Sequence, residues 1–209
     1  MKSAKRQGYR MRVRAEGMAE TRARVVRAML KLAFEQAYED ITLASIAREA
    51  RVSHQTVLNH FDSKEGVTAA AAEIVSRETI AARNKAVPGD VPGAIHVLVG
   101  EYERIGDAGV RWALTADRLS SLAPHLDRAR AGHQAWLERT FGAALPAARD
   151  ARTRSLLSLH AATDVYVWKL LRRDLQLARD ETEAIMVNLV NGILDDRSSP
   201  RRRRRKRAR

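Results

Sequence analysis

Short polar side chains gather between Thr42 and Lys64 at spacings that suit helix surfaces. Hydroxyl, amide and imidazole groups donate and accept hydrogen bonds, so together they suit the recognition of a polar surface. Thr42 and Ser53 each precede an apolar run and have the chemistry of a helix N-cap, where free backbone N–H groups favour a bound phosphate. The full set of candidates is Thr42, Ser53, His54, Gln55, Thr56, Asn59, His60 and Lys64.

No pattern typical of catalysis or metal binding accompanies these residues. The chain has no cysteine, and it contains no nucleophile elbow, phosphate-binding glycine loop, dinucleotide-binding glycine pattern or paired zinc histidines. We therefore expect neither an enzyme nor a bound metal or cofactor. The histidines outside the polar cluster share no metal-ligand spacing: His96, His125, His133 and His160.

Three short predicted helices position the polar cluster. Apolar residues recur every three or four positions over 21–37, which predicts a first helix with one buried stripe. A second helix follows Thr42 and ends near Ala50, and a third runs from Ser53 through Phe61. Such tightly joined helices are typical of a helix-turn-helix, whose second helix enters a DNA major groove about 12 Å wide.

The rest of the chain is predicted to be helical as well. Asp62 and Glu65 have the spacing of a capping box at the start of a longer helix, and the stretch 87–93, rich in proline and glycine, predicts a linker. No strand pattern is present, so the predicted fold class is all-α. Further helices are expected at about 94–105, 110–121, 125–144, 152–178 and 180–194.

The formal net charge is +13, and the whole excess lies at the two ends of the chain. Residues 1–14 contain six bases and no acid, and residues 196–209 contain nine bases and one acid. Between them, residues 15–65 have a net charge of −1 and residues 66–195 are neutral. Segments this basic cannot bury apolar surface, so we expect a disordered arm over 1–19 and a disordered tail over 196–209.

The basic ends fit a polyanion as partner, because each phosphate contact releases counterions. For the tail, the alternatives are DNA, RNA, an anionic membrane or no partner at all. For the arm, Arg10, Arg12 and Arg14 are candidates for an adjacent minor groove. No apolar stretch approaches the roughly 20 residues of a membrane span, so we expect a soluble protein in the cytoplasm, associated with the nucleoid.

Residues 42–64 resemble the N-terminal signature of the tetracycline-repressor-like (TetR) family, which runs roughly T-x-x-x-I-A-x-x-A-G-V-S-x-x-T-x-Y-x-H-F-x-x-K. Arg51 stands at the usual glycine and Leu58 at the usual tyrosine. The flanking helices also fit, so the resemblance covers about residues 20–85. The positions that match in register are Thr42, Ile46, Ala47, Ala50, Val52, Ser53, Thr56, His60, Phe61 and Lys64.

The resemblance implies a three-helix DNA-binding domain over 20–65 and a helical effector-binding and dimerisation domain over 66–195. Homodimerisation would use the last two helices, about 152–178 and 180–194. Implied phosphate contacts come from Thr42, His60 and Lys64, and implied base or phosphate contacts from Ser53, His54, Gln55, Thr56 and Asn59. Aromatic residues that could line an effector pocket, or equally form an ordinary core, are Tyr102, Trp112, Trp136, Tyr166 and Trp168.

The favoured hypothesis is a sequence-specific transcriptional regulator, by default a repressor, that occupies a palindromic double-stranded operator until a small-molecule effector lowers its affinity. The alternative is an architectural nucleoid protein that coats DNA largely non-specifically through its basic arms. Salt separates the two, because coating should weaken roughly uniformly across sequences as salt rises.

Overall fold

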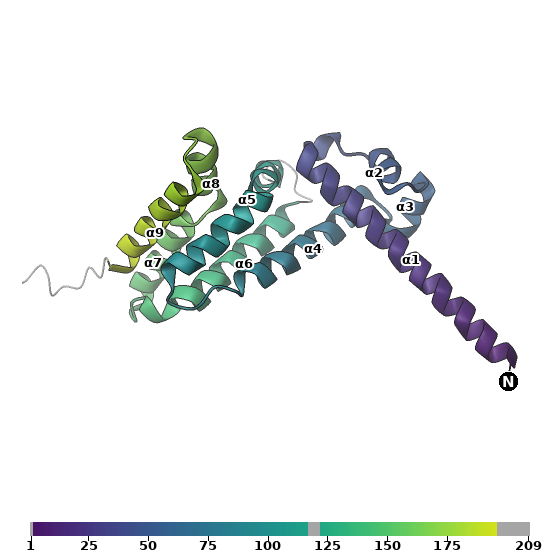
Figure 1. Cartoon of the computed structure of the whole chain (residues 1–209), viewed down its shortest axis with the longest axis horizontal. Helices are drawn as coiled ribbons and strands as arrows, with labels where there is room; N and C mark the ends of the chain where they lie inside the picture. Colours follow the sequence, from purple (N-terminus) through teal and green to yellow (C-terminus); the bar gives the residue numbers. More distant parts are fainter. Residues whose placement is uncertain (1, 117–121, 196–209) are drawn as a thin grey trace, which may run out of the picture. The chain divides into compact units, whose positions relative to one another are not determined.

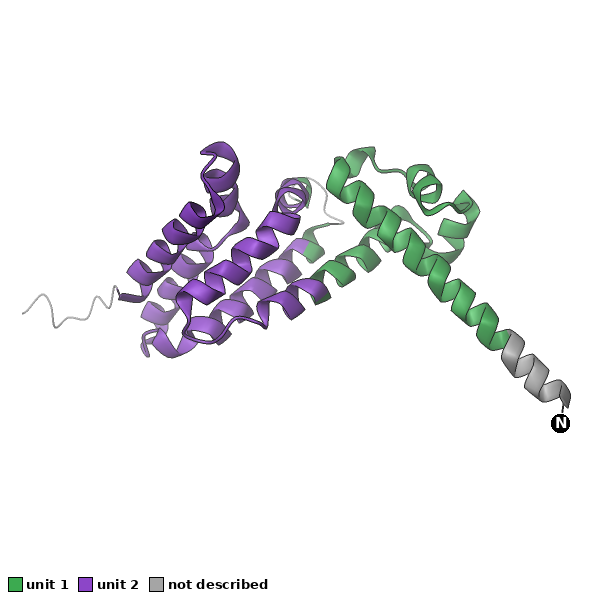
Figure 2. Ribbon diagram, viewed as in Figure 1, with its two compact units in different colours: residues 1–77, 115–125 green, residues 78–114, 126–209 purple. Residues whose placement is uncertain are grey.

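The computed structural model describes residues 2–116 and 122–195, with side chains from residue 11 onward. Within these ranges every regular element is helical, as the sequence predicts, and the elements form two compact units (Figures 1 and 2). The first unit comprises residues 1–77 and 115–125, and the second comprises 78–114 and 126–209. None of the helices in the described ranges is long and apolar enough to cross a membrane. The basic tail over 196–209 lies outside the described residues.

The first unit packs three short elements and the start of a fourth against one long helix. Its elements are α1 (Lys2–Glu35), the 3-10 turn η1 (Tyr38–Asp40), α2 (Leu43–Ala50), α3 (His54–Phe61) and α4 (Lys64–Arg83), of which α4 continues into the second unit. Apolar side chains from each helix are fully buried, among them Val25, Met29, Ile46, Val57 and Val67. These residues form the core that holds α2 and α3.

Helix α1 extends much further toward the N-terminus than the sequence predicts. The expectation of a disordered arm over 1–19 is wrong for residues 2–19, which are helical and continuous with the rest of α1. Arginine, alanine, lysine and methionine predominate there and favour helix, and no proline interrupts the run. Arg12 and Glu16 add an ion pair of 3.6 Å one turn apart. Because residues 11–20 are all exposed, local propensity and not burial accounts for this extension.

The start of α4 differs from the predicted capping box. Asp62 adopts a φ of 62° and terminates α3, and Ser63 caps α4 instead, with its hydroxyl accepting from the Gly66 N–H at 3.2 Å. Gly66 is required here, because a Cβ at this position would lie 2.1 Å from the carbonyl oxygen of Phe61. The tight turn between α3 and α4 therefore depends on a residue without a side chain.

The second unit is a helical bundle around an apolar core. Its elements are α5 (Val91–Ala116), α6 (Ala123–Phe141), η2 (Gly142–Ala144), α7 (Arg149–Ala162), α8 (Val165–Lys169), η3 (Leu170–Asp174) and α9 (Arg179–Asp195), together with the end of α4. Trp136, Trp168 and Met186 are completely or almost completely buried at its centre. The stretch 87–93 predicted as a linker is the connection between α4 and the start of α5, and Gly89 has a φ of 84° there.

A single helix, α5, replaces the two helices predicted around Gly106 and Gly109. Gly106 faces the Trp168 ring so closely that a Cβ would lie 2.4 Å from it, whereas a Cβ on Gly109 would meet nothing within 4 Å. Gly106 is thus a packing residue that lets an indole lie against the helix backbone. The sequence alone does not show that Gly106 lies against Trp168, because about 60 residues separate them.

The long helix predicted over 152–178 is interrupted in the middle. Helix α7 ends at Ala162, and the Asp164 carboxylate caps α8 by accepting from the Tyr166 N–H at 2.9 Å. A single π-helical turn, η3, follows, and Gln176 closes it with a φ of 55°. N-capping chemistry at Asp164 and the π-helical turn therefore break a run whose apolar pattern alone predicts continuity.

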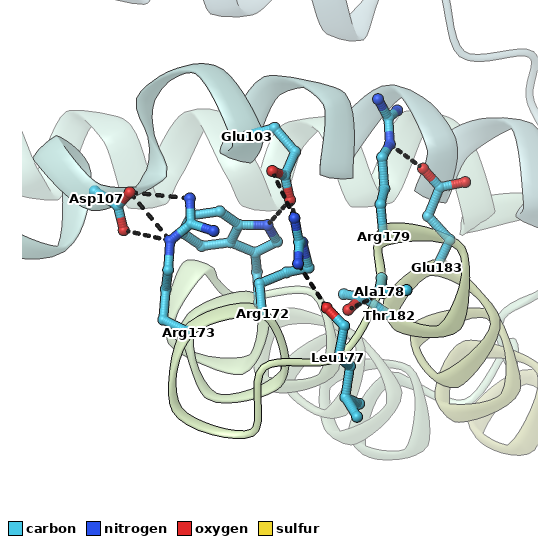
Figure 3. A network of polar contacts seen from close by, with 10 residues as sticks. Glu103, Asp107, Arg172, Arg173, Leu177, Ala178, Arg179, Thr182 and Glu183 are labelled. Atoms are coloured by element: carbon cyan, nitrogen blue, oxygen red, sulfur yellow. Dashed lines mark hydrogen bonds and ion pairs between the residues drawn. The ribbon is translucent and has the colours of Figure 1, made fainter.

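Ion pairs hold η3 against α5 (Figure 3). Glu103 on α5 accepts from Arg172 at 2.6 and 3.2 Å and from the Trp168 indole N–H at 3.0 Å. Arg173 donates to Asp107 through two nitrogens, at 3.0 to 3.1 Å, and its guanidinium lies 4.6 Å from the Trp168 ring centroid. Hydrogen bonding from Arg172 lowers the pKa of Glu103. These contacts fix a turn whose backbone geometry is otherwise unusual.

The two glycines of α5 should respond oppositely to alanine. We expect Gly106→Ala to lower the free energy of unfolding by about 1–3 kcal/mol, because the new methyl group forces the Trp168 ring away. Gly109→Ala, three residues along the same helix, should raise it by up to about 1 kcal/mol, since alanine favours helix and meets no neighbour. Urea unfolding of both variants checks the pair, and equal effects of the same sign would contradict the packing of Trp168 on Gly106.

Candidate nucleic-acid interface

The N-terminus of α2 is capped in the way the sequence predicts. The Thr42 hydroxyl accepts from the Ser45 N–H at 3.0 Å, and the Ser45 hydroxyl oxygen accepts from the Thr42 N–H at 3.0 Å. The Ser45 hydroxyl proton is donated to the Thr42 carbonyl at 2.8 Å. Thr42 therefore keeps its own hydroxyl proton available for an incoming acceptor.

The N-terminus of α3 is capped by Ser53, which is also a predicted cap. Its hydroxyl accepts from the Thr56 N–H at 3.0 Å and lies 2.7 Å from the Thr56 hydroxyl. The remaining N–H groups of the first turn and the positive end of the helix dipole point outward past an exposed serine. Such an end suits a phosphate of the DNA backbone.

Two arginines of α1 tie the ends of α2 and α3 to the long helix. Arg24 donates to the Ala50 carbonyl at 2.9 and 3.2 Å and to the Arg51 carbonyl at 2.9 Å, at the C-terminus of α2. Arg22 donates to the His60 carbonyl at 2.6 Å, and its guanidinium lies 4.1 Å from the Phe61 ring centroid. Sequence reasoning missed both residues, because carbonyls 26 to 38 positions away leave no mark in a local pattern.

The exposed face of α3 consists of His54, Gln55 and Asn59, with Thr56 half-buried beside them. On the opposite side Val57 and Phe61 are buried. Leu58, at the usual tyrosine, is half-buried. The structure therefore brings the predicted base-contacting residues together on one side of one helix.

Lys64 and His60 are less free than the sequence suggests. The Lys64 ammonium donates to the Tyr38 carbonyl at 2.5 Å and lies 3.8 Å from the Tyr38 ring centroid. Burial lowers the pKa of Lys64. His60 is half-buried beside Phe61, with ring centroids 6.3 Å apart. An ammonium has three N–H donors. After the bond to Tyr38, two of them are still available for a phosphate contact from Lys64.

The helical course of α1 changes how the basic N-terminal segment can meet DNA. An α-helix is about 10–12 Å across with its side chains, whereas the minor groove is only about 6 Å wide. The backbone of residues 10–14 is helical and too wide to lie in that groove, and the contact of Arg10, Arg12 and Arg14 side chains with a minor groove stays a prediction. Contacts between arginine side chains and phosphates at the groove edge remain compatible with α1.

The predicted pocket aromatics do not form one cavity. Tyr102, Trp136 and Trp168 are packed in the core of the second unit, with at most 6% of each exposed. Their polar atoms are satisfied internally: the Tyr102 hydroxyl donates to the Thr163 carbonyl at 2.9 Å, and the Trp136 indole donates to the Arg83 carbonyl at 3.3 Å. Tyr166 is 42% exposed, and Trp112 is half-buried.

A buried polar chain runs through the same core. Arg83 pairs with Glu101 at 2.7 Å and donates through Nη1 to His133 Nδ1 at 2.8 Å. His133 must then carry its proton on Nε2, which donates to the Thr163 hydroxyl at 2.9 Å, and this hydroxyl donates to the Leu159 carbonyl at 2.7 Å. Burial, with the positive charge of Arg83, lowers the pKa of His133 to about 2. No group of three potential metal ligands occurs in the described part of the chain.

One family model and several solved structures are similar to this chain. Residues 25–71 match the family described as bacterial regulatory proteins of the tetR family. No protein of curated function matches the chain in sequence. Solved structures share the fold: a Rhodococcus sp. protein assigned to the TetR family is 12% identical with a TM-score of 0.67, over 84% of this chain and 99% of that one.

Two further structures agree with that likeness. A protein of Pseudomonas aeruginosa PAO1 assigned as a transcriptional regulator is 17% identical with a TM-score of 0.67, over 84% of this chain and 90% of that one. GusR of Salmonella enterica is 18% identical with a TM-score of 0.67, over 84% of this chain and 96% of that one. At identities this low, the similarity establishes a common fold. It does not extend to the ligands of these proteins.

Arg51 stands in the left-handed region, with φ 54° and ψ 49°, where the family signature has glycine. We expect Arg51→Gly to raise the free energy of unfolding by up to about 1 kcal/mol, because a side chain in this region costs about 1–2 kcal/mol and the freer unfolded chain offsets part of the gain. The matched change Arg48→Gly, inside α2, should lower it by about 1 kcal/mol. Chemical unfolding measures both, and a destabilised Arg51→Gly would show that the arginine side chain matters more than the strain.

His133 should make stability depend on pH in a defined direction. Its pKa of about 2 lies below the ordinary 6.5, so the unfolded chain binds the extra proton and stability is lost as pH falls below about 6.5. The loss from this one group should approach about 1.4 kcal/mol per pH unit. Urea unfolding at pH 7.5 and pH 5.5 compares the native chain with His133→Gln and with the exposed control His96→Gln. A pH dependence that His133→Gln leaves unchanged would contradict the assignment.

Proposed function

We propose that this chain, whose residues 25–71 match the model of the tetR family of bacterial regulatory proteins, is a homodimeric repressor that a small molecule releases from a palindromic operator. Binding DNA and regulating transcription are the general functions of that family. Repression, the palindrome, the dimer and the effector are the proposal.

The observation on which the proposal rests is the exposed, capped helix pair of the first unit. Both α2 and α3 begin at a capped N-terminus with outward N–H groups, and α3 presents only neutral hydrogen-bonding side chains on its exposed face. Phosphates would bind at the two N-termini, through Thr42 and Ser53, while His54, Gln55 and Asn59 face the base edges. His60 and Lys64 would add contacts to the backbone beyond the end of α3.

Exposed apolar side chains on the last helices support a homodimer. These side chains are large and apolar, yet 42–57% of each is exposed. They lie on α7, α8, η3 and α9 and, for Leu175, directly after η3: Leu157, Tyr166, Leu170, Leu175 and Leu189. A second copy would bury them against the same residues of its partner, as an isologous two-fold interface requires. Two recognition helices would then meet a palindrome, one half-site each.

The effector is proposed to act on the second unit, whose core contains the buried aromatics and the polar chain of Arg83. A hollow of about 150 Å³ between α6 and α7, lined by Gln134, Thr153, Leu156 and Leu157, is smaller than the roughly 300–1,000 Å³ of typical ligand sites. A larger effector must therefore displace core side chains. A tenfold preference for the released state requires only about 1.4 kcal/mol of differential affinity.

Selection from randomised duplex DNA tests this function. With excess competitor DNA at about 150 mM salt, we expect the full chain to recover a palindrome, because base contacts survive where purely electrostatic binding weakens. A chain without residues 2–14 should recover the same palindrome with lower affinity and a flatter dependence on salt. The slope should fall by about 0.9 for each phosphate that these residues neutralise in the full chain.

The contrary results are equally specific. A folded full chain that binds DNA but selects no consensus would contradict the repressor and favour the coating role of the basic ends. An unchanged salt slope after removal of residues 2–14 would show that this part of α1 touches no phosphate.

A further inference from the structure

The recognition helix of this protein has no formal charge at neutral pH. Its sequence from His54 to Phe61 contains no lysine, arginine, aspartate or glutamate. The commonest reading of guanine uses two hydrogen bonds from arginine or lysine, and cytosine is read by an acid that accepts from its amino group. Neither side chain is available on α3. Neutral amides, which pair with adenine, remain.

The two amides of α3 are joined to each other. Gln55 Nε2 donates to Asn59 Oδ1 at 2.9 Å across one helical turn, and both side chains are exposed. Each amide has two donor hydrogens and an oxygen with two lone pairs. After the mutual bond, Asn59 still has both Nδ2 hydrogens and one lone pair on Oδ1. The bond also fixes which way the Asn59 amide faces, because Gln55 Nε2 can donate only to its oxygen.

We propose that Gln55 and Asn59 act as one unit that recognises adenine in the major groove of each operator half-site. Asn59 Nδ2 donates to adenine N7, and Asn59 Oδ1 accepts from the adenine N6 amino group, which matches the pattern that an A·T pair displays there. Gln55 is a positioning residue that holds the Asn59 amide in the required orientation. The inference rests on the proposed operator binding and specifies its chemistry.

A simpler interpretation is that the pair only stabilises α3. A glutamine–asparagine bond four residues apart on a helix contributes a small free energy by itself. That interpretation predicts a slight loss of helix stability in variants and no change in which base pair is preferred. The recognition unit predicts a change of preference at one position of each half-site, so the two separate cleanly.

The experiment measures binding of the full chain to its selected operator and to duplexes in which each base pair is replaced in turn. For the native chain, one A·T pair in each half-site should be preferred by roughly 5- to 150-fold over the other pairs. Asn59→Ala should remove that preference at this position alone. Asn59→Asp should move it toward C·G, because a carboxylate accepts from the cytosine amino group and cannot donate to adenine N7.

Two further variants separate positioning from general damage. Gln55→Ala should weaken the preference at the same A·T position without moving it, because Asn59 remains but its amide turns freely. His54→Ala, which removes another side chain proposed to face the base edges, should alter a different position of the half-site and leave the preference at this A·T pair unchanged. The salt slope should stay unchanged in Asn59→Ala and Gln55→Ala, since neutral amides displace no counterions.

The outcomes distinguish this inference from the function on which it rests. A palindrome whose every preference survives Asn59→Ala, or in which Asn59→Ala affects a G·C pair, would overturn the adenine reading and leave the repressor intact. The same holds if Asn59→Asp shows no shift toward C·G. A native chain that selects no consensus would overturn both.

Discussion

An eight-residue helix is not stable alone in water, and both α2 and α3 have that length. The whole DNA-binding unit depends on the support that α1 gives them. Val25 and Met29 supply buried apolar surface, while Arg22 and Arg24 satisfy carbonyls at the C-terminal ends of α3 and α2. Each short helix is therefore stabilised by a side-chain cap at its N-terminus and by contacts with α1 at its C-terminus. The exposed face of α3 has a fixed direction only because both ends are held.

Features set by neighbouring residues could be predicted from the sequence, and features set by distant ones could not. Thr42 and Ser53 cap helices because a hydroxyl reaches an N–H three residues on, which a sequence displays directly. The sequence predicts a helix end at Gly106, yet Trp168 needs the bare backbone there for packing. Asp164 interrupts a long apolar run because its carboxylate caps a new helix, a signal present in the sequence but outweighed there by the apolar pattern. Residues 2–19 are helical because their side chains have high helix propensity. The prediction of disorder there rested on their basic charge alone.

The candidate interface divides in the same way. Spacing predicts His54, Gln55 and Asn59 on one face of α3, and the structure agrees. It could not reveal that Lys64 donates to Tyr38 or that Arg24 caps α2, because 26 residues separate each pair. Each of these depends on a rotamer chosen against a three-dimensional neighbour. The aromatic residues show a second limit of sequence-based prediction. Residue type alone cannot distinguish a core from a pocket, because both are lined by apolar and aromatic side chains.

Charge is distributed so that affinity and specificity have different sources. The segment 15–65, which contains the helix-turn-helix, has a net charge of −1, and its capped helix ends attract phosphates through N–H groups and dipoles. Counterion release, the main source of affinity for any DNA, requires cations, and the excess of these lies in residues 1–14 and 196–209. Lysine or arginine side chains that contact phosphates add the same attraction for every sequence. In the proposed mode of binding, the neutral side chains of α3 form hydrogen bonds only with matching base edges. The basic ends would then raise affinity without altering which sequence α3 prefers.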